Sequence, residues 1–157
     1  MARTALRSLL MQALFLLTCC LWANSIGPVA AQKPAPPTHS MSTLSVQVTG
    51  IRNANGKIQL TLYRDSKQVA TETVGIDAKT LTAKAVFANI PPGTYAVELF
   101  HDENNNRDFD LNLMGIPVEG YGMSNNPPRR MGRPGFDETN FQVNQPQCAI
   151  EIKMIYW

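Results

Sequence analysis

The chain has 157 residues, and its 14 Lys and Arg against 12 Asp and Glu leave a formal charge of only +2. This length suits a single domain with a modest buried core. Two of the basic residues, Arg3 and Arg7, lie at the N-terminus, and without them the basic residues equal the acidic ones. The charge balance therefore gives no electrostatic signature of nucleic-acid binding, and we exclude nucleic acid as a partner.

Residues 1–31 have the three-part pattern of a secretory signal peptide. Arg3 and Arg7 precede an apolar run over residues 9–17, and the small residues Val-Ala-Ala end at Ala31. The apolar run is shorter than the ~20 residues of a membrane-spanning helix. We therefore expect cleavage near Ala31 and a periplasmic or secreted mature chain without an integral membrane span.

Two alternatives to this interpretation stay open. The N-terminal segment is an uncleaved anchor in the first, and Cys19 or Cys20 is lipidated in the second, although Thr18 fits a lipoprotein cleavage site poorly. Cleavage at Ala31 leaves Cys148 as the single cysteine, so the mature chain has no internal disulfide.

The remaining chain divides into a Pro-rich segment over residues 32–42, which predicts an extended linker, and a domain over residues 43–157. Apolar residues alternate with polar ones along most of this domain, which predicts strands. The predicted strands cover residues 44–48, 58–62, 71–75, 81–90, 95–99 and 150–156. Asn53–Gly56 has turn chemistry and predicts that the first two strands form a hairpin, whereas residues 64–70 predict a loop or one helical turn.

This pattern predicts an all-β fold. About six or seven short strands separated by turns are typical of an antiparallel β-sandwich of the immunoglobulin-like or prealbumin-like type, and a small closed barrel is the alternative. A long loop over residues 101–140 interrupts the pattern, and a loop of that length in a compact domain is usually functional, disordered or held by a ligand.

The start of this loop carries an oxygen-bearing side chain at every second position. Ca²⁺ takes six to eight oxygen ligands, so a loop that turns alternate side chains inward would suit it. We therefore predict Ca²⁺ as a cofactor, held by Asp102, Asn104, Asn106, Asp108, Asp110 and Asn112. Arg107 and Leu113 occupy the positions where an EF-hand has Gly and Glu, so this is not an EF-hand. The alternative is a solvated loop of Asx turns.

The other side chains give weaker indications of chemistry. His101 has the parity of the inward residues of its strand, so we expect it to be packed inside. Ser124, His101 and Asp102 are the residue types of a catalytic triad, but no nucleophile motif accompanies them, so the sequence does not support one. A contact surface for a partner is predicted from the aromatic, Met and Arg residues of the long loop: Tyr121, Met123, Arg129, Arg130, Arg133 and Phe136.

Several sequence elements carry a family resemblance. Phe87–Val97 (FANIPPGTYAV), the HDEN motif at His101, the GIPxEGYGxSN motif from Gly115 to Asn125 and the pair Gly135-Phe136 resemble the uncharacterised secreted bacterial proteins of domain-of-unknown-function family 2141. The resemblance covers about residues 44–156 and implies an exported β domain without an established activity. The PPGTY turn is also similar to one in prealbumin-like and carboxypeptidase-regulatory-like domains, which bears on the fold alone.

Three functions follow in order of preference. The first is an exported, non-enzymatic binding or structural module with a calcium-stabilised loop. The second is a small carbohydrate- or peptide-binding domain, and the third is a hydrolase using His101 and nearby carboxylates. The expected partner is a protein or glycan of the cell envelope.

Overall fold

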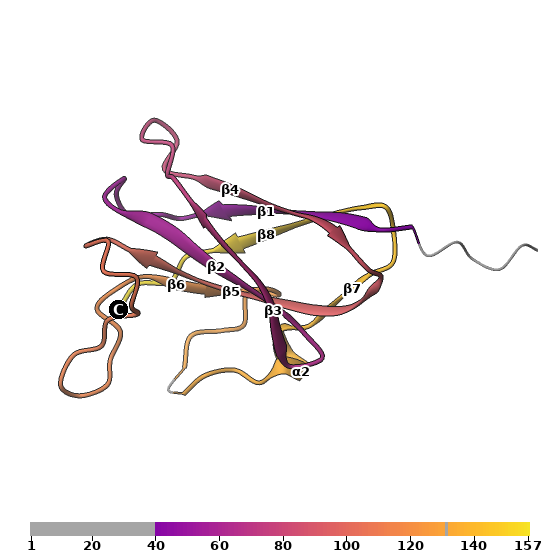
Figure 1. Cartoon of the computed structure of the whole chain (residues 1–157). Helices are drawn as coiled ribbons and strands as arrows, with labels where there is room; N and C mark the ends of the chain where they lie inside the picture. Colours follow the sequence, from indigo (N-terminus) through magenta and orange to yellow (C-terminus); the bar gives the residue numbers. More distant parts are fainter. Residues whose placement is uncertain (1–39, 131) are drawn as a thin grey trace, which may run out of the picture. The chain divides into compact units, whose positions relative to one another are not determined.

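The computed structural model describes residues 40–130 and 132–157 (Figure 1). The expected signal peptide and most of the linker lie outside these residues. The described chain forms eight strands and one short helix, α2 (Phe136–Thr139). The strands are β1 (Ser42–Thr49), β2 (Lys57–Arg64), β3 (Lys67–Val74), β4 (Ala83–Ile90), β5 (Gly93–Asp102), β6 (Tyr121–Met123), β7 (Phe141–Val143) and β8 (Gln147–Lys153). No helix in this part of the chain is long and apolar enough to cross a membrane.

The strands form two sheets, which confirms the all-β sandwich. One sheet has the order β4-β1-β8, and the other has the order β3-β2-β5-β6, with β7 also paired to β5. Two details differ from the prediction. The strand count is eight because β6 and β7 have three residues each, too few to show a period. In addition, β1 pairs with β8 in parallel, whereas all other pairs of named strands are antiparallel.

The core lies between the sheets and is built by the predicted alternation. Leu44, Val46 and Val48 of β1 have no exposed surface, and Ile58, Leu60 and Leu62 of β2 are equally buried to within 1 %. Each such side chain contributes about 1.5–3 kcal/mol when it leaves water. Because the inward positions are filled in this way, the side chains at the alternate positions of β2 and β5 point to the outer face.

The predicted hairpin between the first two strands is wrong. β1 pairs with β4 and β8, whereas β2 pairs with β3 and β5, so the connection from Gly50 to Gly56 passes from one sheet to the other. Ile51 is buried within this connection, and both glycines have positive φ angles. A Cβ on Gly56 would lie 1.8 Å from the carbonyl oxygen of Asp102, so only glycine fits there.

The loop or helical turn predicted for residues 64–70 is also wrong. β3 starts at Lys67, directly after a two-residue turn at Asp65 and Ser66, and it pairs with β2 as a true hairpin. Both turn residues have positive φ angles, of 48° and 65°. This turn normally takes Asn-Gly or Asp-Gly, so Asp-Ser did not signal it.

The loop expected over residues 101–140 is subdivided by regular structure. β5 continues through Asp102, and β6 pairs with β5 with Phe100 opposite Tyr121. Figure 1 shows the chain before and after β6 on the side of β5 that faces away from β1, β4 and β8. The two segments, residues 103–120 and 124–130, therefore approach the outer face of the five-stranded sheet.

Candidate functional site

Asp102 ends β5 and anchors the loop that follows it, residues 103–118, which is called the Asp/Asn loop below. Its side chain is only 1 % exposed, and both carboxylate oxygens accept hydrogen bonds from the loop. The amide of Asn106 donates to Oδ1 and the amide of Arg107 donates to Oδ2, each over 3.0 Å. Gln59 of β2 also donates to Oδ2, over 3.2 Å. These bonds turn the loop back on itself at the strand end.

Asp110 meets two of the predicted asparagines on the other side of this turn. The side-chain amide of Asn104 donates to Asp110 Oδ2 over 2.7 Å, and that of Asn106 donates to both carboxylate oxygens over 3.1 and 3.2 Å. The structure thus brings together Asp102, Asn104, Asn106 and Asp110, four of the six predicted calcium ligands.

The other two predicted ligands have different surroundings. Asn112 Oδ1 accepts the amides of Met114 and Ile116, which closes the tip of the loop. Asp108 contributes its backbone amide to Asn106 Oδ1, over 2.8 Å. Across the described residues, no three His, Cys, Asp or Glu side chains are arranged to hold a metal ion. Calcium binding by this loop stays a prediction.

Glu119 also belongs to this cluster, although it was not among the predicted calcium ligands. It is 4 % exposed, and its two carboxylate oxygens accept the amides of Glu103 and Asp110 over 3.0 and 3.3 Å. Burial raises the pKa of Glu119, and the negative charges of Asp110 and Asp102 raise that pKa further. The available sequence signal for Glu119 was its place in the GIPxEGYGxSN motif of the family resemblance.

His101 is fully buried, as its parity predicts. Its Nδ1 lies 2.9 Å from the Tyr156 hydroxyl and its Nε2 lies 2.6 Å from the carbonyl oxygen of Asn55. Ser124, the nucleophile of the triad considered above, is also buried. Its hydroxyl donates to the carbonyl of Thr139 over 2.5 Å and accepts the amide of Val97 over 2.9 Å. Both side chains therefore have structural hydrogen bonds to partners other than each other.

A groove of about 480 Å³ lies on the outer face of the five-stranded sheet. Three parts of the chain line it: outward side chains of β2, β5 and β6, the loop from Phe109 to Pro117, and a third part made of Arg130, Gly132, Arg133, Pro134 and Trp157. Its sheet side is formed by Thr61, Tyr63, Glu98, Phe100, Tyr121 and Met123. The register places Glu98 between Thr61 and Met123 on neighbouring strands.

The charged groups of the groove are paired. Arg133 Nε donates to Glu98 Oε1 over 2.9 Å, and Arg133 Nη2 contacts both Glu98 and the Tyr63 hydroxyl. Arg130 forms an ion pair with Glu138 of α2. The groove therefore combines aromatic surface with two ion pairs.

The structure brings four of the six predicted contact residues to this groove: Tyr121, Met123, Arg130 and Arg133. Arg129 lies outside it and stacks on Trp157, with its guanidinium carbon 3.9 Å from the ring centroid, and Phe136 is partly buried in α2. Sequence reasoning missed Tyr63, Phe100, Phe109 and Trp157. The available signal for Tyr63 and Phe100 was an aromatic residue at an outward strand position, where a polar residue is usual.

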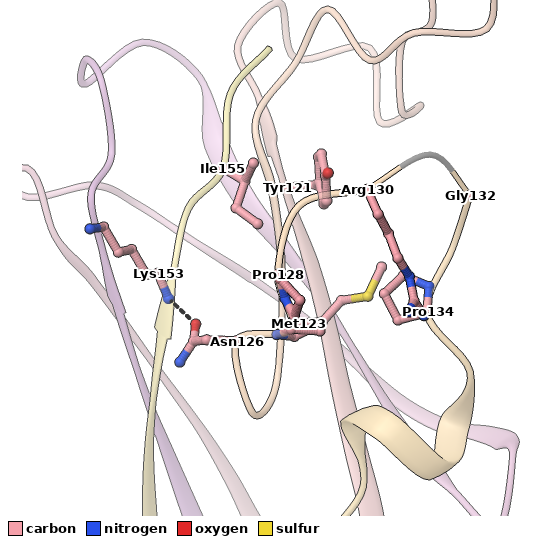
Figure 2. Close-up of a pocket in the computed structure, with 10 residues that line it drawn as sticks. Tyr121, Met123, Asn126, Pro128, Arg130, Gly132, Pro134, Lys153 and Ile155 are labelled. Atoms are coloured by element: carbon pink, nitrogen blue, oxygen red, sulfur yellow. Dashed lines mark hydrogen bonds between the residues drawn. The ribbon is translucent and has the colours of Figure 1, made fainter.

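A small pocket adjoins the groove and shares Tyr121, Met123 and Arg130 with it (Figure 2). Asn126 Oδ1 accepts the amide of Lys153 there, over 2.7 Å, and so fastens the segment after β6 to the end of β8. The space in this pocket is about 10 Å³, enough for one water molecule. The pocket is therefore too small for an organic ligand, and the groove is the candidate site.

The fold and the groove together define a small two-sheet β domain with a candidate binding site on one outer face. The sequence profile of a family described as "Uncharacterized protein conserved in bacteria (DUF2141)" matches residues 46–151, and the chain belongs to this family. No curated protein and no solved structure matches the chain, so the likeness to prealbumin-like domains stays a prediction.

Proposed function

We propose that this protein is an exported, non-enzymatic binding module that holds its ligand in the groove of the five-stranded sheet. The observation that carries the proposal is the groove itself: a concave, mostly apolar surface with a few fixed polar groups is the usual form of a binding site. Phe109 and Trp157 line it with 38 % and 40 % of their surfaces exposed.

The proposal favours binding over a purely structural role because large aromatic side chains at outward positions cost free energy when water covers them. Phe100 lies between Glu98 and Asp102 on the outer side of β5, and Tyr63 occupies the same side of β2. Such surface is retained where a partner covers it. The third alternative, a hydrolase, is disfavoured because both ring nitrogens of His101 already have structural partners.

The Asp/Asn loop is the second part of the proposal. Its C-terminal half supplies Phe109, Leu111 and Ile116 to the groove, so the order of the loop sets the shape of one part of the site. Calcium at Asp102, Asn104, Asn106 and Asp110 would hold that loop in place. The proximity of these four side chains supports this role.

An array of glycans and peptides probed with the purified protein tests the binding function. We expect one ligand class to bind, and Phe100→Ala and Trp157→Ala to weaken that binding at least about tenfold, as for residues at the centre of an interface. Val86→Ala is the matched control, because Val86 is an exposed apolar residue of β4 in the other sheet. Binding that is equally strong in all four proteins would place the site elsewhere and contradict the proposal.

A further inference from the structure

We propose that the ligand of the groove is an uncharged carbohydrate chain. This inference rests on the proposed function, because it takes the groove as the binding site. Three features of the groove carry it: the arrangement of its aromatic rings, the free hydrogen-bonding capacity of its polar groups and its paired charges.

The aromatic residues provide ring faces to which a sugar can bind. Phe109 contacts both Phe100 and Tyr121. Its ring centroid lies 5.6 Å from that of Phe100 at an interplanar angle of 54°, and 6.1 Å from that of Tyr121 at an angle of 74°. The contacts are tilted, with the edge of one ring toward the face of its neighbour, and Phe109 keeps 38 % of its surface exposed. A pyranose ring has one face made of C–H groups with partial positive charge, which complements the negative face of an aromatic ring.

The polar groups of the groove retain hydrogen-bonding capacity for hydroxyl groups. Arg133 binds Glu98 through Nε and Nη2 and also donates from Nη2 to the Tyr63 hydroxyl, which leaves about two of the roughly five guanidinium N–H donors free, and the Glu98 carboxylate has about four lone-pair sites. Their mutual ion pair fixes both planar groups in orientation. Thr61, whose side chain carries a hydroxyl, lines the same groove from the strand beside Glu98. Planar groups held beside an aromatic surface suit a ring that is apolar on its face and hydroxylated at its edge.

The charges of the groove favour a neutral ligand. Three charged residues line it, Glu98, Arg130 and Arg133, and each is paired with an opposite charge. A phosphate or carboxylate ligand would compete with Glu98 or Glu138 for these arginines. A neutral chain leaves both intact.

The location of the groove disfavours an extended peptide. Peptides that add to a sheet need a free strand edge. The groove lies over the face of β2, β5 and β6, and β5 is paired on both sides. Tyr121 of β6 pairs with β5 on one side and with Ile155 on the other. The amide of Tyr121 donates to the carbonyl of Ile155 over 3.0 Å, and the amide of Ile155 donates to the carbonyl of Tyr121 over 2.7 Å. The backbone beneath the groove is therefore already satisfied.

Trp157 provides a direct probe of occupancy. It lines the groove, and it is the single tryptophan of a chain that begins at Gln32. We expect neutral β-linked hexasaccharides of glucose or N-acetylglucosamine to change its fluorescence in a saturable way. Phe100→Ala should weaken the binding by about tenfold or more, with melting curves checked for both proteins, whereas Val86→Ala should bind as the wild type does.

The outcomes separate this inference from the proposed function. Saturable binding of a neutral hexasaccharide that depends on Phe100 supports both. Binding of uronic-acid oligosaccharides alone, or of peptides alone, with the same dependence on Phe100 overturns the neutral carbohydrate and leaves the groove as a binding site. No binding of any of these probes, by fluorescence and by calorimetry, overturns both.

Discussion

Glu103 joins the end of β5 to the segment from Gly50 to Gly56, which passes from one sheet to the other. Its carboxylate forms an ion pair with Arg52 and accepts the side-chain amide of Asn53 over 2.9 Å, and it lies 3.8 Å from His101. Burial alone would raise the pKa of Glu103, but the hydrogen bonds from Asn53 and Arg52 outweigh it and lower the pKa. The ionised form is therefore the one that stabilises the fold.

The lowered pKa of Glu103 gives a prediction with a definite sign. Its contribution is present above the unfolded value of 4.5 and is lost as the pH falls through the lower folded pKa. Glu103→Gln should cost about 1–3 kcal/mol at pH 7, and the difference from wild type should shrink in acid. Urea denaturation at several pH values measures it. The exposed Glu72→Gln on β3 is the control, and a cost that does not change with pH would refute the assignment.

At the scale of the element, the Asp/Asn loop is the segment whose stability should respond to calcium. The negative charges of Asp110 and Asp102 repel that of Glu119, and this repulsion is part of what raises the pKa of Glu119. A divalent cation would remove that repulsion. Asn104 and Asn106 now donate their amide groups to Asp110, and a rotation of each amide would present its oxygen instead.

We therefore expect the melting temperature to rise with Ca²⁺. A dissociation constant of roughly 10⁻⁴–10⁻³ M is typical of extracellular sites, and calcium at ten times that constant would add ~1.4 kcal/mol. Mg²⁺ should have a smaller effect because it prefers a tighter octahedral site. Differential scanning calorimetry measures the shift.

Two variants sharpen the calcium test. Asp110→Ala should abolish the calcium-dependent shift, whereas Asp137→Ala, an exposed aspartate in α2, should retain it. If about 10 mM Ca²⁺ and EDTA both leave the wild-type melting curve unchanged, the loop is an Asx-turn segment held by its own hydrogen bonds.

At the scale of the whole molecule, the predicted export would decide in which compartment the protein meets a ligand. The N-terminal pattern predicts that mass spectrometry of the periplasmic or secreted protein finds an N-terminus at or near Gln32. Ala31→Phe should cause the precursor to accumulate, because cleavage needs a small residue there, and Gln32→Asn should be processed normally. A wild-type chain that retains Met1 in the cytoplasmic fraction would contradict export.

The sequence by itself determined β1, β2, β4, β5 and β8, because burial of one strand face imposes a period of two. Leu44, Val46 and Val48 show it in β1, and Tyr95, Val97 and Leu99 show it in β5. It also indicated four residues that line the groove, since aromatic and Arg side chains in a long loop are typical of binding surfaces. These are properties of residue type and local spacing.

Only the tertiary structure decided which strands pair and which loop residues meet. The Asn53–Gly56 segment has the chemistry of a hairpin turn, but Leu44 and Leu60 both reach the core when the segment crosses between sheets, and that burial outweighs the local preference. Glu119 reaches the Asp/Asn loop from a distance in sequence because β6 pairs with β5. Contacts of this kind depend on the whole set of strand pairings, which no local pattern records.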